Sequence, residues 1–220
     1  MNIPLRSLAA SVLCTIVSVG AFANDADDAR AELLQAARLT PNITHGSALF
    51  ETCAACHGRD GLGASDGSVP AVAGQHGSVL LKQLVDFRHG NRWDFRMEEH
   101  AKQHFLGTPQ DIADVAAFVN QLDGGNQRGT GDGIHAADGA RIFGARCAAC
   151  HGHDGAGNAR QAIPRLGGQH YAYLMRQMYD AVDGRRPTLQ QVHPRKIEPL
   201  DFEQVRAVAD YLSRIDWDAK

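Results

Sequence analysis

Two cysteines three positions apart, followed at once by a histidine, occur twice in this chain with the same five letters, Cys-Ala-Ala-Cys-His. The residues that carry the chemistry are Cys53, Cys56, His57, Cys147, Cys150 and His151. Two sulfurs one helical turn apart reach the two vinyl groups of one haem and form thioethers with them. The histidine then lies under the iron and supplies the first axial nitrogen. The pattern predicts two covalently attached c-type haems, haem 1 on the first copy and haem 2 on the second.

A lone C-x-x-C pair is also typical of a zinc half-site or a redox dithiol. Both copies here carry the trailing histidine, and they begin 94 residues apart, at positions 53 and 147. A zinc ribbon brings its second pair within roughly 15–20 residues, so the spacing favours haem. The fifth cysteine, Cys14, lies in the amino-terminal apolar run, so the mature chain has no cysteine left for a structural disulfide.

The same signals follow each motif in the same order. A glycine-rich loop leads to Pro70 and Gly74-Gln75-His76 in the first copy, and to Pro164 and Gly168-Gln169-His170 in the second. Glycine lets the backbone turn and pass close to a flat porphyrin. We expect each proline carbonyl to accept the proton on the outer nitrogen of the axial histidine, which fixes that ring. The histidine that ends each tripeptide either caps the next helix or faces the other domain.

Apolar residues at helical spacing predict matching helices in the two repeats. A short helix runs into each haem motif, from Gly46 in the first copy and from Gly139 in the second, which has one extra residue. Another helix follows each Gly-Gln-His. The last helix starts at Thr108-Pro109 in the first repeat and at a capping box from Asp201 to Gln204 in the second. No run alternates like a strand, so we predict an all-α fold of two small domains, each built around its haem.

Composition and spacing indicate the boundaries. Residues 1–23 are typical of a signal peptide, because Arg6 precedes an apolar run of about a dozen residues and a small-x-small cleavage pattern. A retained anchor is the alternative, although the run is shorter than the ≈ 20 residues that span a bilayer. We expect domains at 24–122 and 134–220, joined by a glycine-rich linker at 123–133. Loss of Arg6 with the signal changes the formal charge from −3 to −4, which does not indicate a nucleic-acid partner.

The doubled order of C-x-x-C-H, proline, Gly-Gln, helix, Gly-x-Arg and final helix resembles the dihaem cytochrome c4 family over nearly all of the mature chain. The resemblance implies two tandem cytochrome c-like helical domains and a periplasmic electron carrier. It also implies a methionine as the sixth ligand of each iron. Met97 stands seven residues after Gly90 and is the only methionine of the mature first repeat. We therefore expect His57 and Met97 as the axial ligands of haem 1, with His100 and His104 as competitors.

The second repeat departs from that pattern. Gln191 stands seven residues after Gly184, and no methionine follows Met178. His193 is the nearest strong iron ligand in this segment, so we hypothesise His151 and His193 as the axial pair of haem 2. The alternative is an exposed His193 beside an open or weakly ligated iron. Because imidazole donates more strongly than a thioether, haem 1 should be easier to reduce than haem 2.

Two arginines occupy matching positions near the end of each repeat's middle segment. Arg92 and Arg186 each follow the repeat's glycine by two residues. A guanidinium in this place either pairs with a haem propionate through a charge-assisted contact or is solvated.

These sites support two functions. Six-coordinate irons have no vacant position for a substrate, so the first interpretation is an electron carrier, not an enzyme, with one electron per haem. The second is a haem enzyme or a gas- or ligand-binding protein that uses an open distal site on haem 2. The second repeat shows no inserted loop that would build a substrate pocket, which favours the carrier. We expect redox partners such as membrane respiratory complexes or terminal oxidases, a monomer, and at most a loose association with a membrane surface.

Overall fold

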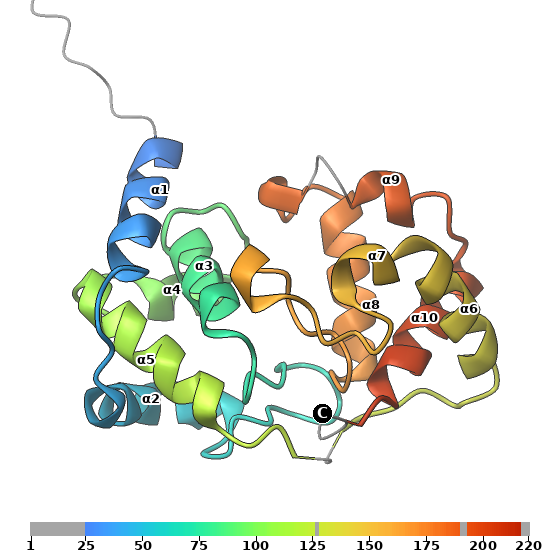
Figure 1. Ribbon diagram of the computed structural model, residues 1–220, viewed down its shortest axis with the longest axis horizontal. Coiled ribbons are helices and arrows are strands. Elements are labelled where there is room, and N and C mark those ends of the chain that lie inside the picture. Colours follow the sequence, from blue (N-terminus) through green and yellow to red (C-terminus); the bar gives the residue numbers. More distant parts are fainter. Residues whose placement is uncertain (1–24, 126–127, 190–192, 217–220) are drawn as a thin grey trace, which may run out of the picture.

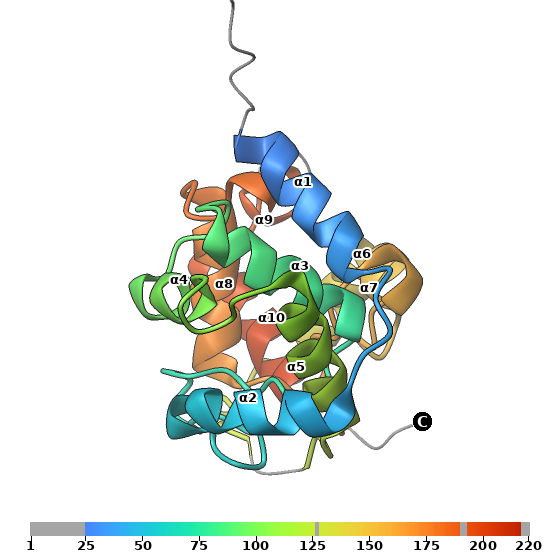
Figure 2. The same cartoon turned by 90° about the vertical axis from the view of Figure 1, so that its left-hand side faces the viewer.

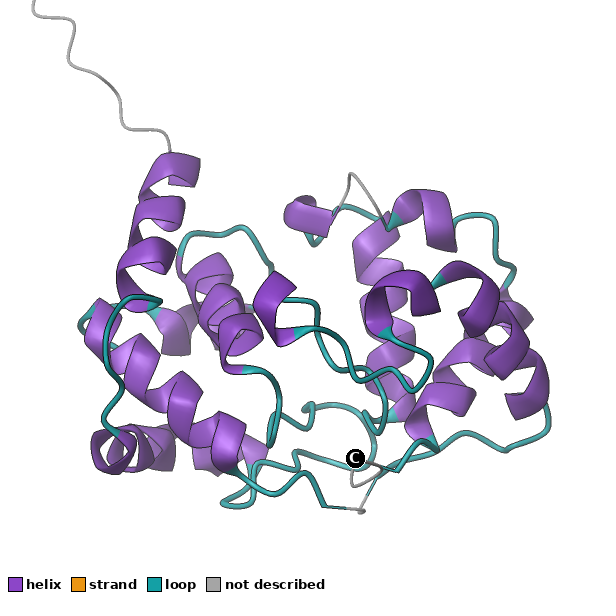
Figure 3. Ribbon diagram, in the orientation of Figure 1, coloured by secondary structure: helices purple, strands orange, loops and turns teal. Residues whose placement is uncertain are grey.

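The computed structural model describes residues 25–125, 128–189 and 193–216. Helices dominate these ranges (Figure 3), which contain no β-strand and only an isolated bridge between Asn158 and Ile163. No helix within them is long and apolar enough to cross a membrane. The all-helical fold class is confirmed. The predicted signal peptide lies outside the described residues, as does Gln191.

The first repeat forms one lobe of the molecule, coloured blue to green in Figure 1. Its described helices are α1 (Asp25–Ala36), α2 (Ile43–His57), α3 (Gly77–Arg88), α4 (Phe95–Ala101) and α5 (Pro109–Gln121). Helix α2 packs against α5, and α1 lies over α3 and α5 (Figure 2). Glu32 on α1 pairs with Arg88 and with His89 at the end of α3, which ties the lead-in helix to the lobe.

The second repeat forms the other lobe, coloured yellow to red in Figure 1. Its described elements are α6 (Ala136–Arg146), α7 (Ala148–His151), the 3₁₀ turn η1 (Ala159–Gln161), α8 (Tyr171–Val182), the 3₁₀ turn η2 (Pro187–Leu189), α9 (Pro194–Ile197) and α10 (Phe202–Ser213). Helix α10 packs against α6 and α8, as α5 packs against α2 and α3. The two lobes therefore repeat one arrangement of helices.

Both predicted starts of the last helices are confirmed. The Thr108 hydroxyl accepts from Asp111 N at 3.2 Å while the Asp111 carboxylate accepts from Thr108 N at 2.9 Å. Asp201 and Gln204 exchange the same two bonds, at 2.8 and 3.2 Å. Each box satisfies backbone N–H groups that a helix start leaves without partners. These local signals fix where α5 and α10 begin.

A glycine lies at each crossing of the motif helix with the last helix. A Cβ on Gly46 would stand 2.1 Å from the carbonyl oxygen of Asp114, and one on Gly139 would stand 1.9 Å from that of Ala207. Only glycine permits backbones to approach this closely. The crossings therefore fix where each motif helix sits on its lobe.

The extra residue of the second copy breaks its motif helix. Helix α2 continues unbroken through Cys53 to His57, whereas α6 ends at Arg146 and α7 starts after Cys147, whose φ is −118° and ψ −34°. One additional residue turns a helix by about 100°. With Gly139 held at the crossing, a continuous helix would rotate the motif away from the site, and the break at Cys147 restores its direction.

Each lobe has its own apolar core. In the first, Phe50 of α2 packs with Val85 of α3 and Ile112 of α5. In the second, Phe143 of α6 packs with the apolar faces of α8 and α10. Phe50 and Phe143, at corresponding places on the two motif helices, are both buried.

The two lobes are joined by reciprocal contacts from the Gly-Gln-His tripeptides. Gln75 donates from Nε2 to the carbonyl of Arg165 at 3.0 Å and accepts from Arg165 N at 3.0 Å. Gln169 makes the same pair of bonds with Ala71, at 2.7 and 3.0 Å. Ala71 and Arg165 directly follow Pro70 and Pro164 in the sequence. Each repeat thus holds the backbone of the other at the same place.

The histidines of the tripeptides add a second reciprocal contact. His76 Nε2 donates to the carbonyl of Ala156 at 2.7 Å, and His170 Nε2 donates to that of Leu62 at 2.7 Å. Of the two roles expected for these histidines, the one facing the other domain is confirmed, because neither side chain caps its helix. His170 also accepts from Gly129 N at 3.2 Å, which holds part of the predicted linker against the second lobe.

Candidate haem sites

Each histidine of the C-x-x-C-H motifs is buried and held through one ring nitrogen. His57 Nδ1 donates to the carbonyl of Pro70 at 3.0 Å, and His151 Nδ1 donates to that of Pro164 at 3.1 Å. The predicted proline contacts are confirmed. They leave Nε2 of each ring as the nitrogen available to a metal. Burial lowers the pKa of both histidines, and the proline bond opposes this shift, so the neutral, ligating form is favoured.

The four motif cysteines form no disulfide and lie one turn apart within each motif, beside these histidines. Burial raises the pKa of the Cys53 thiol to about 11, and burial also raises that of Cys147. A redox dithiol or a zinc thiolate requires the opposite shift. In the described ranges, moreover, no three His, Cys, Asp or Glu side chains gather as a metal site would require. The chemistry of the donors therefore fits thioether attachment better than either alternative.

The second site brings a second histidine toward the first. The ring centres of His151 and His193 are 6.3 Å apart, with planes inclined by 64°. A metal bonded at about 2.0–2.1 Å to a nitrogen of each of two facing rings separates their centres by about 6 Å. Nδ1 of His193 is buried without a hydrogen-bond partner. Burial, and then the neighbouring His151 and Arg186, lower the pKa of His193, and the Leu189 backbone opposes this shift without reversing it, so the neutral ring is favoured. Both rings fit a shared iron.

Met97 lies in the first turn of α4, where its backbone N donates to the N-cap Asp94 at 3.3 Å. Its side chain is half-buried. After burial and the Pro70 bond, the next effects on the pKa of His57 come from Arg96 and Asp94, which places this segment beside the ring. The competing ligand His104 pairs through Nε2 with Glu99 at 3.1 Å.

The rings of both competing histidines lie against a partly exposed aromatic side chain. His100 stacks on Phe105 with ring centres 4.9 Å apart, and His104 contacts the same ring at 4.3 Å. His104 is thus held by Glu99 and Phe105, whereas His100 also lies near enough to His57 to lower its pKa, so His100 stays the competitor of Met97 at haem 1.

The matching arginines meet at the boundary between the lobes. Arg92 donates to Gln83, Gln177 and Tyr173 at 2.5–2.7 Å, and Arg186 donates to the same two glutamines at 3.1 and 3.2 Å. The solvated alternative is wrong for both. Nε of Arg186 is buried without a partner, and burial together with Arg92 lowers the Arg186 pKa to about 10. Two half-buried guanidinium groups bonded to neutral amides, one with a buried Nε, fit a nearby anion such as a propionate.

A family model described as Cytochrome c matches this chain twice, over residues 43–123 and 136–216. The chain belongs to the cytochrome c family. Cytochrome c4 of Pseudomonas aeruginosa is 34% identical over 149 residues, which are 64% of this chain and 71% of that protein. The crystal structure of reduced recombinant cytochrome c4 from Pseudomonas stutzeri superposes with a TM-score of 0.72 at 28% identity, covering 80% of this chain and all of that one. The resemblance to the dihaem cytochrome c4 family is confirmed.

A further relative has a name that states its role. The thiosulfate dehydrogenase electron acceptor of Stutzerimonas stutzeri is 30% identical over 173 residues, which are 74% of this chain and 78% of that protein. Together with the double family match, these relatives identify the protein as an electron-transfer cytochrome. Each of its two domains carries a covalently bound haem c. The haem supplies an iron that cycles between ferric and ferrous states.

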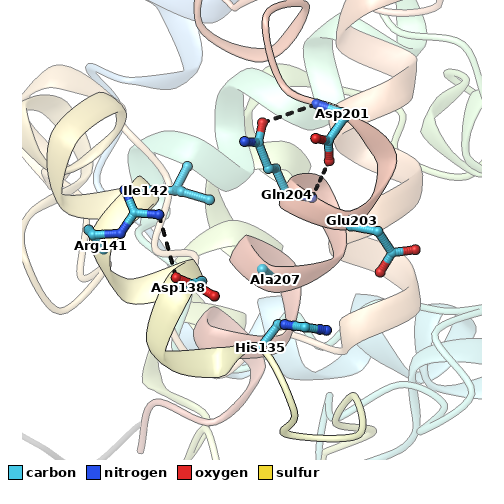
Figure 4. Close-up of a pocket in the computed structure, with 8 residues that line it drawn as sticks. All are labelled: His135, Asp138, Arg141, Ile142, Asp201, Glu203, Gln204 and Ala207. Atoms are coloured by element: carbon cyan, nitrogen blue, oxygen red, sulfur yellow. Dashed lines mark hydrogen bonds and ion pairs between the residues drawn. The ribbon is translucent and has the colours of Figure 1, made fainter.

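A surface pocket of about 190 Å³ lies between α6 and the start of α10 (Figure 4). Four of its polar side chains are bonded in pairs: Arg141 pairs with Asp138 at 3.4 Å, and Asp201 and Gln204 form the capping box. No residue of either C-x-x-C-H motif lines it. The pocket is therefore separate from the haem chemistry of this cytochrome.

The sequence did not predict the contacts of Gln75 and Gln169, although these residues lie between the haem sites and join them. Their partners are backbone atoms of the other repeat. The signal that was available is the identical Gly-Gln-His at matching positions, which a purely local turn does not require.

Proposed function

We propose that this protein is an exported, periplasmic dihaem cytochrome that carries electrons between redox proteins, one electron per haem, without transforming a substrate. The observation that most supports this is the pair of rings at the second site, His151 and His193, whose centres are 6.3 Å apart. An iron between them has both axial positions filled. Such an iron exchanges electrons while offering no position for a substrate.

The proposed axial ligands are His57 and Met97 for haem 1 and His151 and His193 for haem 2, and the proposed thioethers form at the four motif cysteines. Methionine is the softer donor and favours ferrous iron, so haem 1 is the easier to reduce and electrons settle there. Arg186, whose Nε is buried without a partner, supports the ligation scheme indirectly, because a propionate paired with it would place that edge of the haem at the boundary between the lobes.

The proposed organisation is a signal peptide at 1–23, domains at 24–122 and 134–220, and a linker at 123–133. Thioether attachment on the outer side of the bacterial membrane agrees with export. The named role of one relative, an electron acceptor of thiosulfate dehydrogenase, supports exchange with other redox proteins. As partners we propose membrane respiratory complexes or terminal oxidases, met by a monomer that associates loosely at most with the membrane surface.

Low-temperature electron paramagnetic resonance of the oxidised protein tests the ligands in one sample. We expect one low-spin signal typical of His/Met iron and one typical of His/His iron. Carbon monoxide added to the reduced protein should bind slowly at both haems, because each sixth position is filled. A high-spin signal together with rapid, stoichiometric binding at one haem would instead identify a ligand-binding protein with an open site.

Replacing His193 tests the second site alone. In His193→Ala we expect haem 2 to become high-spin and to bind carbon monoxide rapidly, while the signal of haem 1 is unchanged. His100→Ala is the matched control, since it removes an imidazole whose ring stacks on Phe105, and it should alter neither spectrum. If haem 2 stays low-spin in His193→Ala, His193 is not its ligand.

A further inference from the structure

A continuous chain of hydrogen bonds runs from each motif histidine into the other lobe. His57 Nδ1 donates to the carbonyl of Pro70, and the N–H of the same peptide unit, that of Ala71, donates to Oε1 of Gln169 at 3.0 Å. The chain therefore passes from a histidine of the first repeat, through one peptide group, to a side chain of the second repeat.

The second motif has the mirror arrangement. His151 Nδ1 donates to the carbonyl of Pro164, and the N–H of that peptide unit, carried by Arg165, donates to Oε1 of Gln75 at 3.0 Å. Both bonds from the peptide N–H have the same length, and the histidine bonds differ by 0.1 Å. The relation is reciprocal, and it depends on side chains that sit 94 residues apart at matching positions.

The orientation of each glutamine amide is fixed by its surroundings. Gln169 Nε2 donates to the carbonyl of Ala71 at 2.7 Å, so its Oε1 must be the atom that accepts from Ala71 N and from His170 N. Gln169 and Ala71 are both buried, with 6% and 5% of their surfaces exposed. Little water competes for these bonds, and a hydrogen bond in such surroundings polarises its neighbours.

We propose that Gln169 tunes haem 1 and that Gln75 tunes haem 2, each acting as a positioning residue on the haem of the other domain. An acceptor on the Ala71 N–H polarises the Pro70–Ala71 peptide and makes the Pro70 carbonyl a stronger acceptor for His57. A histidine whose outer proton is held more strongly is a more basic ligand and favours ferric iron. Each glutamine therefore lowers the potential of the haem across the boundary. This rests on the axial roles proposed for His57 and His151.

The two effects should differ in size. Gln169 is buried, whereas Gln75 is only half-buried, and water reaches Gln75 more readily. A hydrogen bond in a drier site is electrostatically stronger. The influence of Gln169 on haem 1 is therefore the larger of the two.

Potentiometry of the full holoprotein, with the two haems resolved by their spectra, tests the proposal on Gln169→Leu and Gln75→Leu. In Gln169→Leu we expect the ferrous-to-ferric ratio of haem 1 at a fixed potential to rise about two- to fourfold, or about 18–36 mV for a one-electron couple, with a smaller change at haem 2. In Gln75→Leu the pattern should be exchanged. The Nδ1 proton of the affected histidine should also shift in the nuclear magnetic resonance spectrum of the reduced protein.

Gln83→Leu and Gln177→Leu are the matched controls. These glutamines occupy matching positions 94 residues apart and contact the boundary arginines, but neither bonds a proline peptide. They report what the loss of boundary hydrogen bonds, including those to the arginines proposed beside the propionates, does to the potentials. The proposal is supported if each glutamine variant shifts the potential of the haem in the other domain more than that of its own, and by more than either control does. We call this result the cross pattern. Equal shifts at both haems, a shift confined to the haem of the mutated domain, or shifts no larger than the controls overturn it.

The unmodified protein separates this proposal from the proposed function. If His57 and His151 do not ligate iron, the low-spin signals are absent before any glutamine is changed, and the proposed function fails as well. If those signals are present and the glutamine variants lack the cross pattern, only the coupling proposal fails.

Discussion

The two repeats share the C-x-x-C-H side of each haem site and differ in the segments proposed to supply the sixth ligand. Each motif histidine is buried and bonded to a proline carbonyl, at 3.0 Å in the first repeat and 3.1 Å in the second. On the other side, the first repeat has the helix α4 with Met97, whereas the second has His193 just before α9. The common half fits attachment of both haems, and the differing half is where the proposed ligation scheme makes the two haems unlike.

Attachment can be removed from one repeat at a time, and this is the largest effect we expect. The double variant Cys53→Ala with Cys56→Ala should lose haem 1 and keep haem 2, which halves the haem content per chain. Without thioethers the iron depends on its axial ligands alone. Pyridine haemochrome assay against protein concentration measures the ratio. The matched double variant at Cys147 and Cys150 should halve it too, and two haems retained in either would contradict the assignment.

Giving haem 2 the proposed ligand of haem 1 should remove much of the difference in reduction potential between the two haems. In His193→Met a thioether replaces an imidazole, so we expect the potential of haem 2 to rise by on the order of 0.1 V. Spectroelectrochemical titration follows this. The opposite exchange, Met97→His, should lower the potential of haem 1 by a similar amount. If both potentials are unchanged in these variants, burial or nearby charge, and not the sixth ligand, determines the difference in potential between the two haems.

Alanine at the two glycine crossings tests whether both repeats depend equally on close helix packing for their stability. Gly46→Ala and Gly139→Ala should each destabilise the protein by about 3 kcal/mol, because the added Cβ meets a backbone carbonyl oxygen at 2.1 and 1.9 Å. Gly144→Ala, on the same helix as Gly139, should stabilise by about 1 kcal/mol, since nothing lies within 4 Å of its Cβ position. Denaturant unfolding measures all three, and a destabilising Gly144→Ala would mean that α6 is strained there.

The smallest effect we expect concerns acid and the contact between His170 and the linker. Burial lowers the pKa of His170 below its ordinary value, and His170 accepts from Gly129 N, which requires the neutral ring. Below about pH 6.5 the unfolded chain therefore binds a proton that the folded chain does not. The free energy of unfolding decreases as the pH is lowered, until the pKa of His170 in the folded chain is reached.

Replacing His170 should weaken this acid sensitivity. We expect the loss of unfolding free energy between about pH 7.5 and about pH 5.5 to be smaller in His170→Gln, by less than about 1 kcal/mol. Thermal unfolding at the two pH values measures it. His76→Gln is the control, because His76 makes the equivalent bond across the boundary. An unchanged pH dependence in His170→Gln would show that the linker contact does not respond to protonation.

Local signals were sufficient to predict much of the fold and half of each site. Thr108 and Asp201 mark helix starts because their capping bonds span only three residues. The proline contacts of His57 and His151 were predictable because both partners lie in one short glycine-rich loop, 13 residues apart. Such interactions leave a pattern of residue types in a short stretch of sequence.

Contacts between the repeats could not be predicted in the same way. Gln75 and Gln169 bond backbone atoms 90 and 98 residues away, and any residue type supplies those atoms, so no side-chain pattern marks the partner. The break at Cys147 was hidden for a related reason. The extra residue is visible in the sequence, but its result depends on Gly139 being held at a crossing that forms only in the folded lobe.

The exchange of glutamine contacts has the form of an isologous interface, in which the same surface of two copies meets around a twofold axis. In a homodimer joined by such contacts the two subunits have one sequence, so their two sites are identical. In this single chain the same contacts join two repeats whose sequences are free to differ. A mutation can therefore change the Met97 segment or the His193 segment alone. The hydrogen bonds of Gln75 and Gln169 that join the lobes are left in place.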